Sequence, residues 1–161
     1  MNGADVLLVL GLDQATNVCG YCLMERKEEG NNIVDVGVVH IKGNSVEEKI
    51  SYLKHWVIEY AEKYKPNYFV LEDIQYQNNQ RTYKVLAELL GVLSNVYHEN
   101  EVNYIVVPPV TWKSFFGIKG KARKEQKENT RKYIKDKFDI EVSEDEADAI
   151  CIALYGCNEF S

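Results

Sequence analysis

Two carboxylates in this sequence follow apolar segments that are typical of buried strands. Asp13 comes directly after VLLVLGL, and Glu72 comes directly after NYFVL. A bare charge in a protein core is very costly, so each carboxylate must reach water or a positive partner. Because ligands of open α/β sheets gather at the carboxyl ends of the strands, we expect both acids to face a site at that edge.

A second pair of carboxylates lies in the segment SEDEADAICIALYG near the C-terminus. Acids in a first helical turn favour the helix dipole, and this suffices to explain Glu144 and Glu146. Asp145 and Asp148 differ, because they are three residues apart and share the helix face that continues as an apolar stripe. The small alanines on either side of Asp148 would let this helix approach the sheet closely. We therefore favour a functional role for Asp145 and Asp148.

Carboxylates that converge in a partly dry site repel one another and require divalent cations. Magnesium accepts oxygen ligands and keeps several waters, so a few carboxylates and a substrate phosphate complete its coordination shell. Two such ions about 4 Å apart can activate water and stabilise the leaving oxygen of a phosphodiester. The four acids therefore predict phosphodiester hydrolysis that depends on Mg²⁺, with Mn²⁺ as a substitute ion.

The elements that would position these acids follow from hydrophobic periodicity and turn residues. Strands are expected over residues 6–13, 18–25, 33–41, 67–72 and 103–108. Helices are expected from Ser45 to about Tyr64, over 83–100, over 110–116, in the basic segment that ends at Lys137, and from about Glu144. Ser45 with Glu48 and Ser143 with Glu146 have the form of capping boxes. Three strands joined by short turns predict an antiparallel meander, and later strands that alternate with helices predict parallel pairing. The expected fold class is α/β: a single domain over residues 1–161, with a mixed five-stranded sheet and helices on both faces.

The segment from Lys119 to Lys137 is strongly basic in an otherwise acidic chain. It holds nine basic and three acidic residues, a local charge of +6, whereas the whole chain has a net charge of −6. This asymmetry predicts a basic face for a polyanion such as DNA. The alternative is a solvated helix face with ion pairs four residues apart, but three acids cannot neutralise nine bases.

The composition also predicts a location. No apolar run approaches the ~18 residues that a membrane helix needs, and the N-terminus lacks the features of a signal peptide. We therefore expect a cytoplasmic protein without a membrane partner, in which the four cysteines remain thiols. Cys19 and Cys22 form a CxxC, but strand residues three apart point to opposite faces, which argues against a metal or redox pair.

The ordered set GLDQAT, FVLEDIQ and DEADAI resembles the catalytic motifs of RuvC-type Holliday junction resolvases, in the RNase H-like superfamily. The order and approximate spacing match over nearly the whole chain. The resemblance implies an RNase H-like fold in which Asp13, Glu72, Asp145 and Asp148 bind two metal ions per active site. It also implies a homodimer that nicks two strands of a four-way junction symmetrically.

The same resemblance implies roles for basic and aromatic residues near the acids. Lysines near the site assist binding and catalysis in the family, and Lys113 in TWKSFFGI and Lys124 in KARKEQ occupy similar places. Lys121 and Arg123 remain alternatives to Lys124. The family's loop after the second acid presses into the junction crossover, and Tyr76 is the only aromatic residue of QYQNNQR. The expected DNA contacts are Tyr76, Lys113, Lys119, Lys121, Arg123, Lys124 and Lys127.

Other functions remain open at this point. The same metal chemistry would serve an RNase H-like nuclease that acts on other branched DNA, on RNA or on hybrids. GLDQATNVCGY also resembles the first phosphate-binding hairpin of actin-like ATPases, but those proteins need two such lobes and this chain offers one. A non-catalytic nucleic-acid-binding module would not need an ordered set of acids.

The helix expected over residues 83–97 carries more apolar surface than one sheet face requires. One stripe is formed by Val85, Leu89, Val92 and Val96, and another by Leu86, Leu90, Leu93 and Tyr97. A helix that covers only its own sheet needs one stripe. The second stripe predicts contact with the same helix of a partner, and the alternative is burial inside its own domain.

Overall fold

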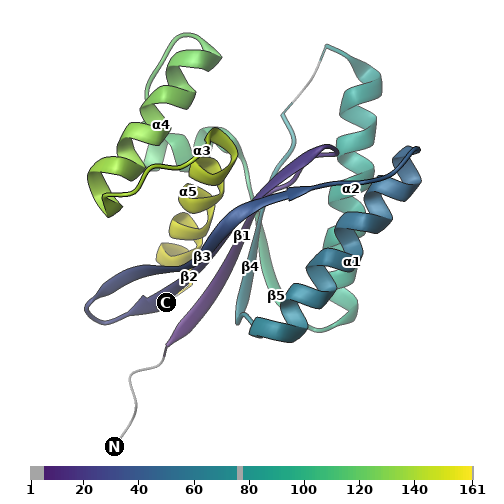
Figure 1. Ribbon diagram of the computed structural model, residues 1–161, viewed down its shortest axis with the longest axis horizontal. Coiled ribbons are helices and arrows are strands. Elements are labelled where there is room, and N and C mark those ends of the chain that lie inside the picture. The colour runs from purple at the N-terminus through teal and green to yellow at the C-terminus, as the bar shows by residue number, and fades with distance from the viewer. Residues whose placement is uncertain (1–5, 76–77, 161) are drawn as a thin grey trace, which may run out of the picture.

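The computed structural model describes residues 6–75 and 78–160, which form a five-stranded sheet with helices on both faces (Figure 1). Its strands are β1 (Leu7–Asp13), β2 (Val18–Lys27), β3 (Gly30–His40), β4 (Tyr68–Glu72) and β5 (Asn103–Val107). The strand order is β3-β2-β1-β4-β5. The first three strands form an antiparallel meander, and β4 and β5 continue the sheet parallel to β1. The mixed sheet predicted from the sequence is therefore confirmed.

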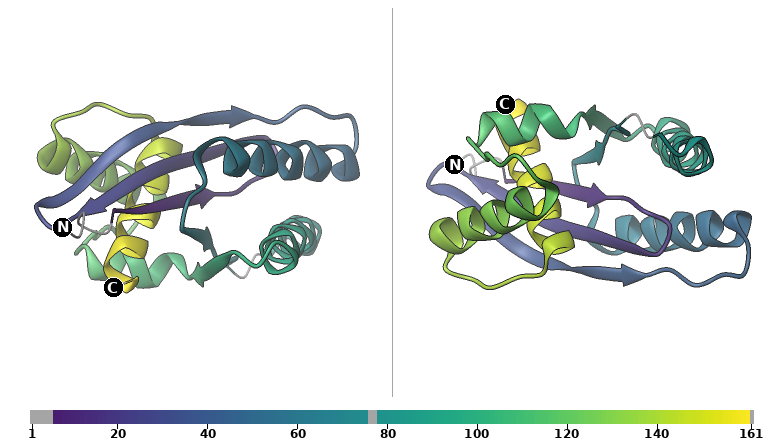
Figure 2. Two further views of the ribbon diagram at one scale, coloured as in Figure 1. Left: turned by 90° about the horizontal axis from the view of Figure 1, so that it is seen from below. Right: turned by 90° about the horizontal axis from the view of Figure 1, so that it is seen from above.

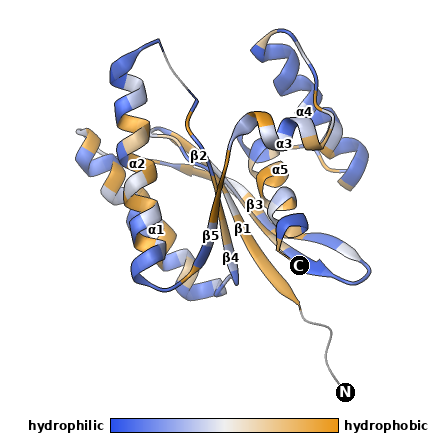
Figure 3. Cartoon of the chain, turned by 180° about the vertical axis from the view of Figure 1, so that it is seen from behind, coloured by the Kyte–Doolittle hydropathy of each residue, from blue (hydrophilic) through white to orange (hydrophobic). Residues whose placement is uncertain are grey.

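The helices lie in two groups on opposite faces of this sheet (Figure 2). They are α1 (Val46–Tyr64), α2 (Gln80–Glu99), α3 (Pro109–Phe115), α4 (Arg123–Phe138) and α5 (Glu144–Glu159). The helices α1 and α2 cover one face, and α5 covers the other with α3 and α4 beside it (Figure 1). Figure 3 shows that α5 is largely hydrophobic, whereas α4 is largely hydrophilic. The core consequently divides into two clusters, one on each side of the sheet.

The alternation of side chains along β1 and β4 decides which way the strand-end acids point. Leu10 and Leu12 of β1 pack in the cluster under α1 and α2, whereas Val9 packs in the cluster under α5. Because the side-chain period of a strand is two, Asp13 shares the face of Val9. By the same rule, Glu72 of β4 shares the α5 face with Val70, which packs in that cluster.

Helix α5 approaches β1 and β2 at backbone distance, because glycines face it from both strands. A Cβ atom on Gly11 would lie 2.6 Å from the Ala153 nitrogen, and one on Gly20 would lie 2.2 Å from the Asp145 carbonyl oxygen. Ala149 also faces Gly11, so the expected close approach through small alanines is confirmed. The strand glycines are the other half of this contact, and glycine inside a strand is itself a signal of close backbone approach.

The helix starts agree with the sequence in part. Ser143 and Glu146 form the complete capping box expected at the start of α5. At α1 the Ser45 side chain caps Glu48 as expected, but the Glu48 carboxylate accepts the N–H of Asn44 rather than that of Ser45. Helix α2 begins at Gln80, three residues before the expected start. The side chain of its N-cap residue, Asn79, accepts the N–H of Thr82 in the first turn.

The cysteines lie as the strand argument predicts. Cys19 packs in the cluster under α1 and α2, and Cys22 packs in the cluster under α5, so the two thiols point to opposite faces of β2. All four cysteines are buried and free. Within the described ranges, no helix has the length and apolar content needed to cross a membrane.

The buried line of α2 combines residues from both predicted stripes. Leu89, Leu93 and Tyr97 are buried against the sheet. Val92 and Val96, which were predicted to share a stripe with Leu89, are only half-buried. Val85 and Val96 of that stripe border α1.

Candidate active site

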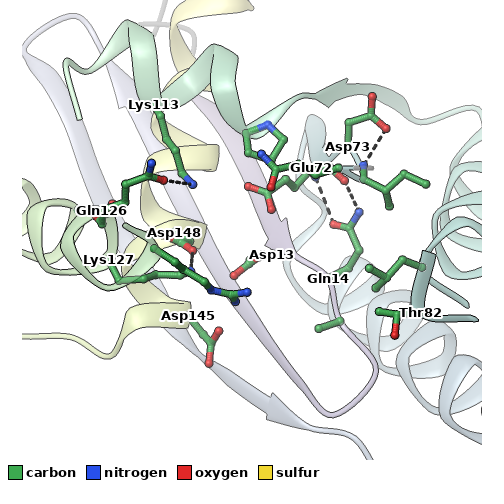
Figure 4. A pocket seen from close by; sticks show the side chains of 17 residues that line it. Asp13, Gln14, Glu72, Asp73, Thr82, Lys113, Gln126, Lys127, Asp145 and Asp148 are labelled. Carbon is green, nitrogen blue, oxygen red and sulfur yellow. Dashed lines mark hydrogen bonds and ion pairs between the residues drawn. The ribbon is translucent and has the colours of Figure 1, made fainter. Parts of the chain in front are cut away.

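The four carboxylates singled out in the sequence line one pocket, which has a volume of about 540 Å³. Asp13 and Glu72 enter it from the ends of neighbouring strands, whereas Asp145 and Asp148 enter it from the beginning of α5 (Figure 4). Asp148 exposes 4% of its surface, and the other three acids are partly buried. The fold thus brings acids from three separate elements to one place.

Burial and mutual repulsion raise the pKa of these carboxyl groups. Burial first, and then the charges of Glu72 and Asp148, hold the pKa of Asp13 well above the usual range of an aspartate. Burial also raises the pKa of Glu72, against a hydrogen bond from Trp112 that lowers it. Burial raises the pKa of Asp148, against the opposing charge of Lys127. A cation in the pocket would favour the ionised form of each group.

Lys127 is a lysine that the structure brings directly to the carboxylates. Its Nζ forms an ion pair with Asp148 Oδ2, and the two side chains expose 15% and 5% of their surface. Burial lowers the pKa of Lys127, but the charges of Asp148, Asp13 and Glu72 outweigh burial, so the pKa is raised. Lys113 also lines the pocket, and its Nζ donates a hydrogen bond of 3.2 Å to Gln126. The sequence predicts only a DNA contact for Lys127, so its place among the acids was missed.

Lys124, the lysine of α4 that was expected in catalysis, lies elsewhere. Its side chain is exposed, and it is not among the residues that line the pocket. Lys127 shares a helix face with Thr130 and Ile134, which are buried, whereas Lys124 lies at the exposed edge of that face. Ile134 is one of the few apolar residues of α4, so counting back two turns from it could have identified Lys127.

The remaining predicted DNA contacts fall into three groups. Arg123 lines the acidic pocket, and Lys119 lines a smaller neighbouring pocket together with Lys113. Lys121 is exposed on the loop before α4. Tyr76 lies outside the described residues.

Glu72 has two close contacts that the sequence did not predict. The indole Nε1 of Trp112 donates a hydrogen bond of 2.7 Å to Glu72 Oε2. The side-chain amide of Gln14 pairs with the backbone of Glu72: its Oε1 accepts the Glu72 N–H at 3.2 Å, and its Nε2 donates to the Glu72 carbonyl oxygen (Figure 4). Glu72 is therefore held through both its carboxylate and its peptide groups.

The donor set of the pocket suits a hard divalent cation, because it consists of carboxylate oxygens. Asp148 Oδ1 is buried and has no hydrogen-bond partner among the described residues, so an ion would supply a missing partner. As the side chains stand in residues 6–75 and 78–160, no three of the His, Cys, Asp and Glu groups are gathered closely enough to hold an ion. The Lys127 ammonium lies against Asp148 as a cation would. The residues fit a divalent ion if the carboxylates draw together around it.

Comparison with known proteins gives a consistent match over most of the chain. A family model described as "Crossover junction endodeoxyribonuclease RuvC" matches residues 9–156. The RuvC protein of Fusobacterium nucleatum is 28% identical over 151 residues, which cover 93% of this chain and 80% of the relative. The RuvC protein of Brachyspira hyodysenteriae is 28% identical over 149 residues, which cover 92% of each protein.

Solved structures of Holliday junction resolvases share the fold. Thermus thermophilus RuvC in complex with a Holliday junction substrate superposes with a TM-score of 0.75 at 16% identity, over 92% of this chain and 91% of that one. The yeast mitochondrial resolvase gives a TM-score of 0.66 at 15% identity, over 95% and 84% of the two chains. The fowlpox virus resolvase with its junction DNA gives 0.65 at 11% identity, over 95% and 98%.

Removing one charge from the pocket should stabilise the metal-free protein. The folded-state pKa of Asp13 is raised, so the ionised group destabilises the fold above that pKa, and the penalty disappears as the pH falls toward the usual aspartate range. We expect Asp13→Asn to raise the melting temperature in chelator at pH 8 by roughly 2–4 °C for each kcal/mol relieved, and by less at pH 5. Differential scanning calorimetry measures this. The exposed control Glu29→Gln should leave the melting temperature unchanged, and a lower value for Asp13→Asn at pH 8 would contradict the repulsion.

Proposed function

The chain belongs to the RuvC family of crossover junction endodeoxyribonucleases, and we propose that it resolves four-way DNA junctions by metal-dependent hydrolysis of two opposed strands. The observation that carries the proposal is the family match over residues 9–156, which includes Asp13, Glu72, Asp145 and Asp148 of the pocket. A nucleic-acid-binding module or a phosphate-binding lobe of an ATPase would not require this set. The proposal includes a cytoplasmic location, which agrees with four buried, free thiols.

The proposed metal ligands are Asp13, Glu72, Asp145 and Asp148. Oxygen ligands of this kind suit Mg²⁺, and we propose two ions per site with Mn²⁺ able to substitute. When bound, such ions supply an activated water and stabilise the leaving oxygen of a phosphodiester. The acids hold the ions on rigid strand ends and on the start of α5, so their relative positions do not depend on a flexible loop.

Positive side chains around the same pocket are proposed to hold the substrate phosphate. Lys113, Arg123 and Lys127 line it, and each can donate hydrogen bonds to phosphate oxygens. The structure supports Lys127 rather than Lys124 as the lysine of α4 that acts within the site, because Lys127 already contacts a carboxylate there. Lys119, Lys121 and Lys124 would instead contact phosphates farther along the DNA.

We propose that the active protein is a homodimer. A four-way junction needs nicks in two opposed strands, and a two-fold symmetric dimer supplies two sites with matching symmetry. Helix α2 offers a surface for this contact: Val92 is only half-buried on the flank where its neighbours Val85 and Val96 border α1 of the same chain. The same helix of a second copy would cover this flank.

Cleavage of a four-way junction tests the central proposal. We expect cutting of the junction, but not of a matched duplex or RNA–DNA hybrid, with Mg²⁺ or Mn²⁺ and none in chelator. Asp13→Asn should slow cutting by about 10³-fold or more, since a metal ion supplies several kcal/mol of transition-state stabilisation. Glu144→Gln, at an exposed acid of α5 that does not line the pocket, is the control and should cut normally. Undiminished cutting by Asp13→Asn would refute the metal-site assignment, and better cutting of the hybrid would identify a different RNase H-like nuclease.

The salt dependence of junction binding tests the basic surface. Each phosphate contact contributes roughly 0.9 to the slope of log affinity against log salt. Joint replacement of Lys121, Arg123 and Lys124 by alanine should therefore flatten the slope by up to about 2.7. Replacing Lys27 and Lys63, which lie at the other end of the sheet, should leave the slope unchanged. Fluorescence anisotropy in Ca²⁺ or chelator measures binding without cutting, and an unaltered slope in the triple variant would mean that these bases form only a solvated face.

Paired cutting tests the homodimer. Sedimentation at micromolar concentration should show a dimer, and a supercoiled plasmid that extrudes a cruciform should give linear product directly. Val92→Glu, which places a charge on the proposed α2 contact, should give a monomer that produces open circles first. A wild-type monomer that yields only open circles would contradict resolution by paired nicks.

A further inference from the structure

We propose that Trp112 and Gln14 are positioning residues that hold the Glu72 carboxylate ready for a metal ion. The proposal rests on the nuclease function proposed above and extends it to two residues that carry no metal themselves. Trp112 acts on the carboxylate and Gln14 acts on the peptide groups of the same residue. Together they would fix the backbone and the carboxylate of Glu72 before an ion arrives.

The Trp112 contact is built into the core under α5. The residue has no exposed surface and packs in that hydrophobic cluster, with its Nε1 2.7 Å from Glu72 Oε2. An indole can only donate, and a buried donor without a partner is costly, so the carboxylate is the acceptor that this side chain requires. A hydrogen bond to an ionised group is also stronger than one between neutral groups. The bond engages one carboxylate oxygen and leaves the other for an ion.

The Gln14 contact continues the sheet beyond its last strand pair. The parallel register of β1 and β4 runs to the pair Leu12 and Leu71. One step farther along, the Gln14 amide binds both the N–H and the carbonyl oxygen of Glu72, as a strand peptide would. Gln14 follows Asp13 directly, so this pairing fixes the backbone of Asp13 relative to that of Glu72, and both are proposed metal ligands.

Fixing Glu72 matters because the carboxylates of Asp13, Asp145 and Asp148 line the same pocket. Like charges repel one another, so a Glu72 carboxylate that nothing held would turn away from the other acids toward water. Outer-shell partners of metal ligands typically change metal affinity 10–100-fold when they are removed.

The test is Mn²⁺ binding to the DNA-free protein, measured by electron paramagnetic resonance. Trp112→Phe removes the N–H and keeps a ring, and Gln14→Met keeps the side-chain length without the amide. We expect each to weaken Mn²⁺ binding about 10–100-fold. Trp56→Phe is the matched control, since Trp56 stacks on Tyr60 in the other core, and it should bind Mn²⁺ normally. Melting temperatures identify any variant that fails to fold. If Trp112→Phe does not fold, Gln14→Met alone decides the test, because Gln14 is only partly buried.

A double-mutant cycle separates positioning from a general structural effect. In a Glu72→Ala background the carboxylate is absent, so Trp112→Phe should no longer alter Mn²⁺ affinity. An equal loss in both backgrounds, or no loss in either, would overturn the positioning role while wild-type Mn²⁺ binding left the nuclease proposal standing. Wild-type protein that bound no Mn²⁺ would overturn both. A second readout needs no metal: the chain has two tryptophans, and Glu72→Ala should shift the Trp112 indole signal in a ¹H–¹⁵N spectrum but not that of Trp56.

Discussion

Like charges held together in a partly dry pocket are the constraint on which the rest of this structure depends. In addition to burial, Glu72 and Asp148 raise the pKa of Asp13, so the carboxylates oppose their own assembly. Each acid leaves a strand or helix that is anchored in one of the two hydrophobic clusters. Buried apolar surface stabilises a fold by about 25 cal/mol for each Å², so clusters of this size can offset a local electrostatic penalty. The two cores therefore serve the site as well as the fold.

The position of α5 shows how little freedom this arrangement leaves. Gly11 and Gly20 bring the helix backbone onto β1 and β2, where one contact is with the carbonyl of Asp145 itself. Backbone atoms cannot adjust as long side chains do, so the helix cannot slide along the sheet without a clash. The pair Asp145 and Asp148 is thereby fixed relative to Asp13. Steric contact below the pocket sets the spacing of charges within it.

Local patterns in the sequence predict the position of a site residue when that position depends on a single strand or helix. Strand ends placed Asp13 and Glu72 at one edge of the sheet, and helical spacing placed Asp148 beside the sheet, where all three line the pocket. The same patterns did not single out Trp112, and they predicted only a DNA contact for Lys127. A tryptophan in an apolar helix and a lysine in a basic one look ordinary, and their contacts arise only when α3 and α4 pack beside α5. Side chains that act across elements were therefore the ones missed.

The distribution of charge follows from the two opposite tasks of the surface. Four carboxylates alone would repel a DNA backbone, yet they must lie next to a phosphate if they are to act on it. Lys113, Arg123 and Lys127 line the same pocket and offset part of this negative charge. Three positive side chains cannot balance the acids of this pocket and also attract a phosphate, so the proposed divalent ions would supply the remaining charge. The acidic chain concentrates its bases on α4 and the loop before it, beside this pocket.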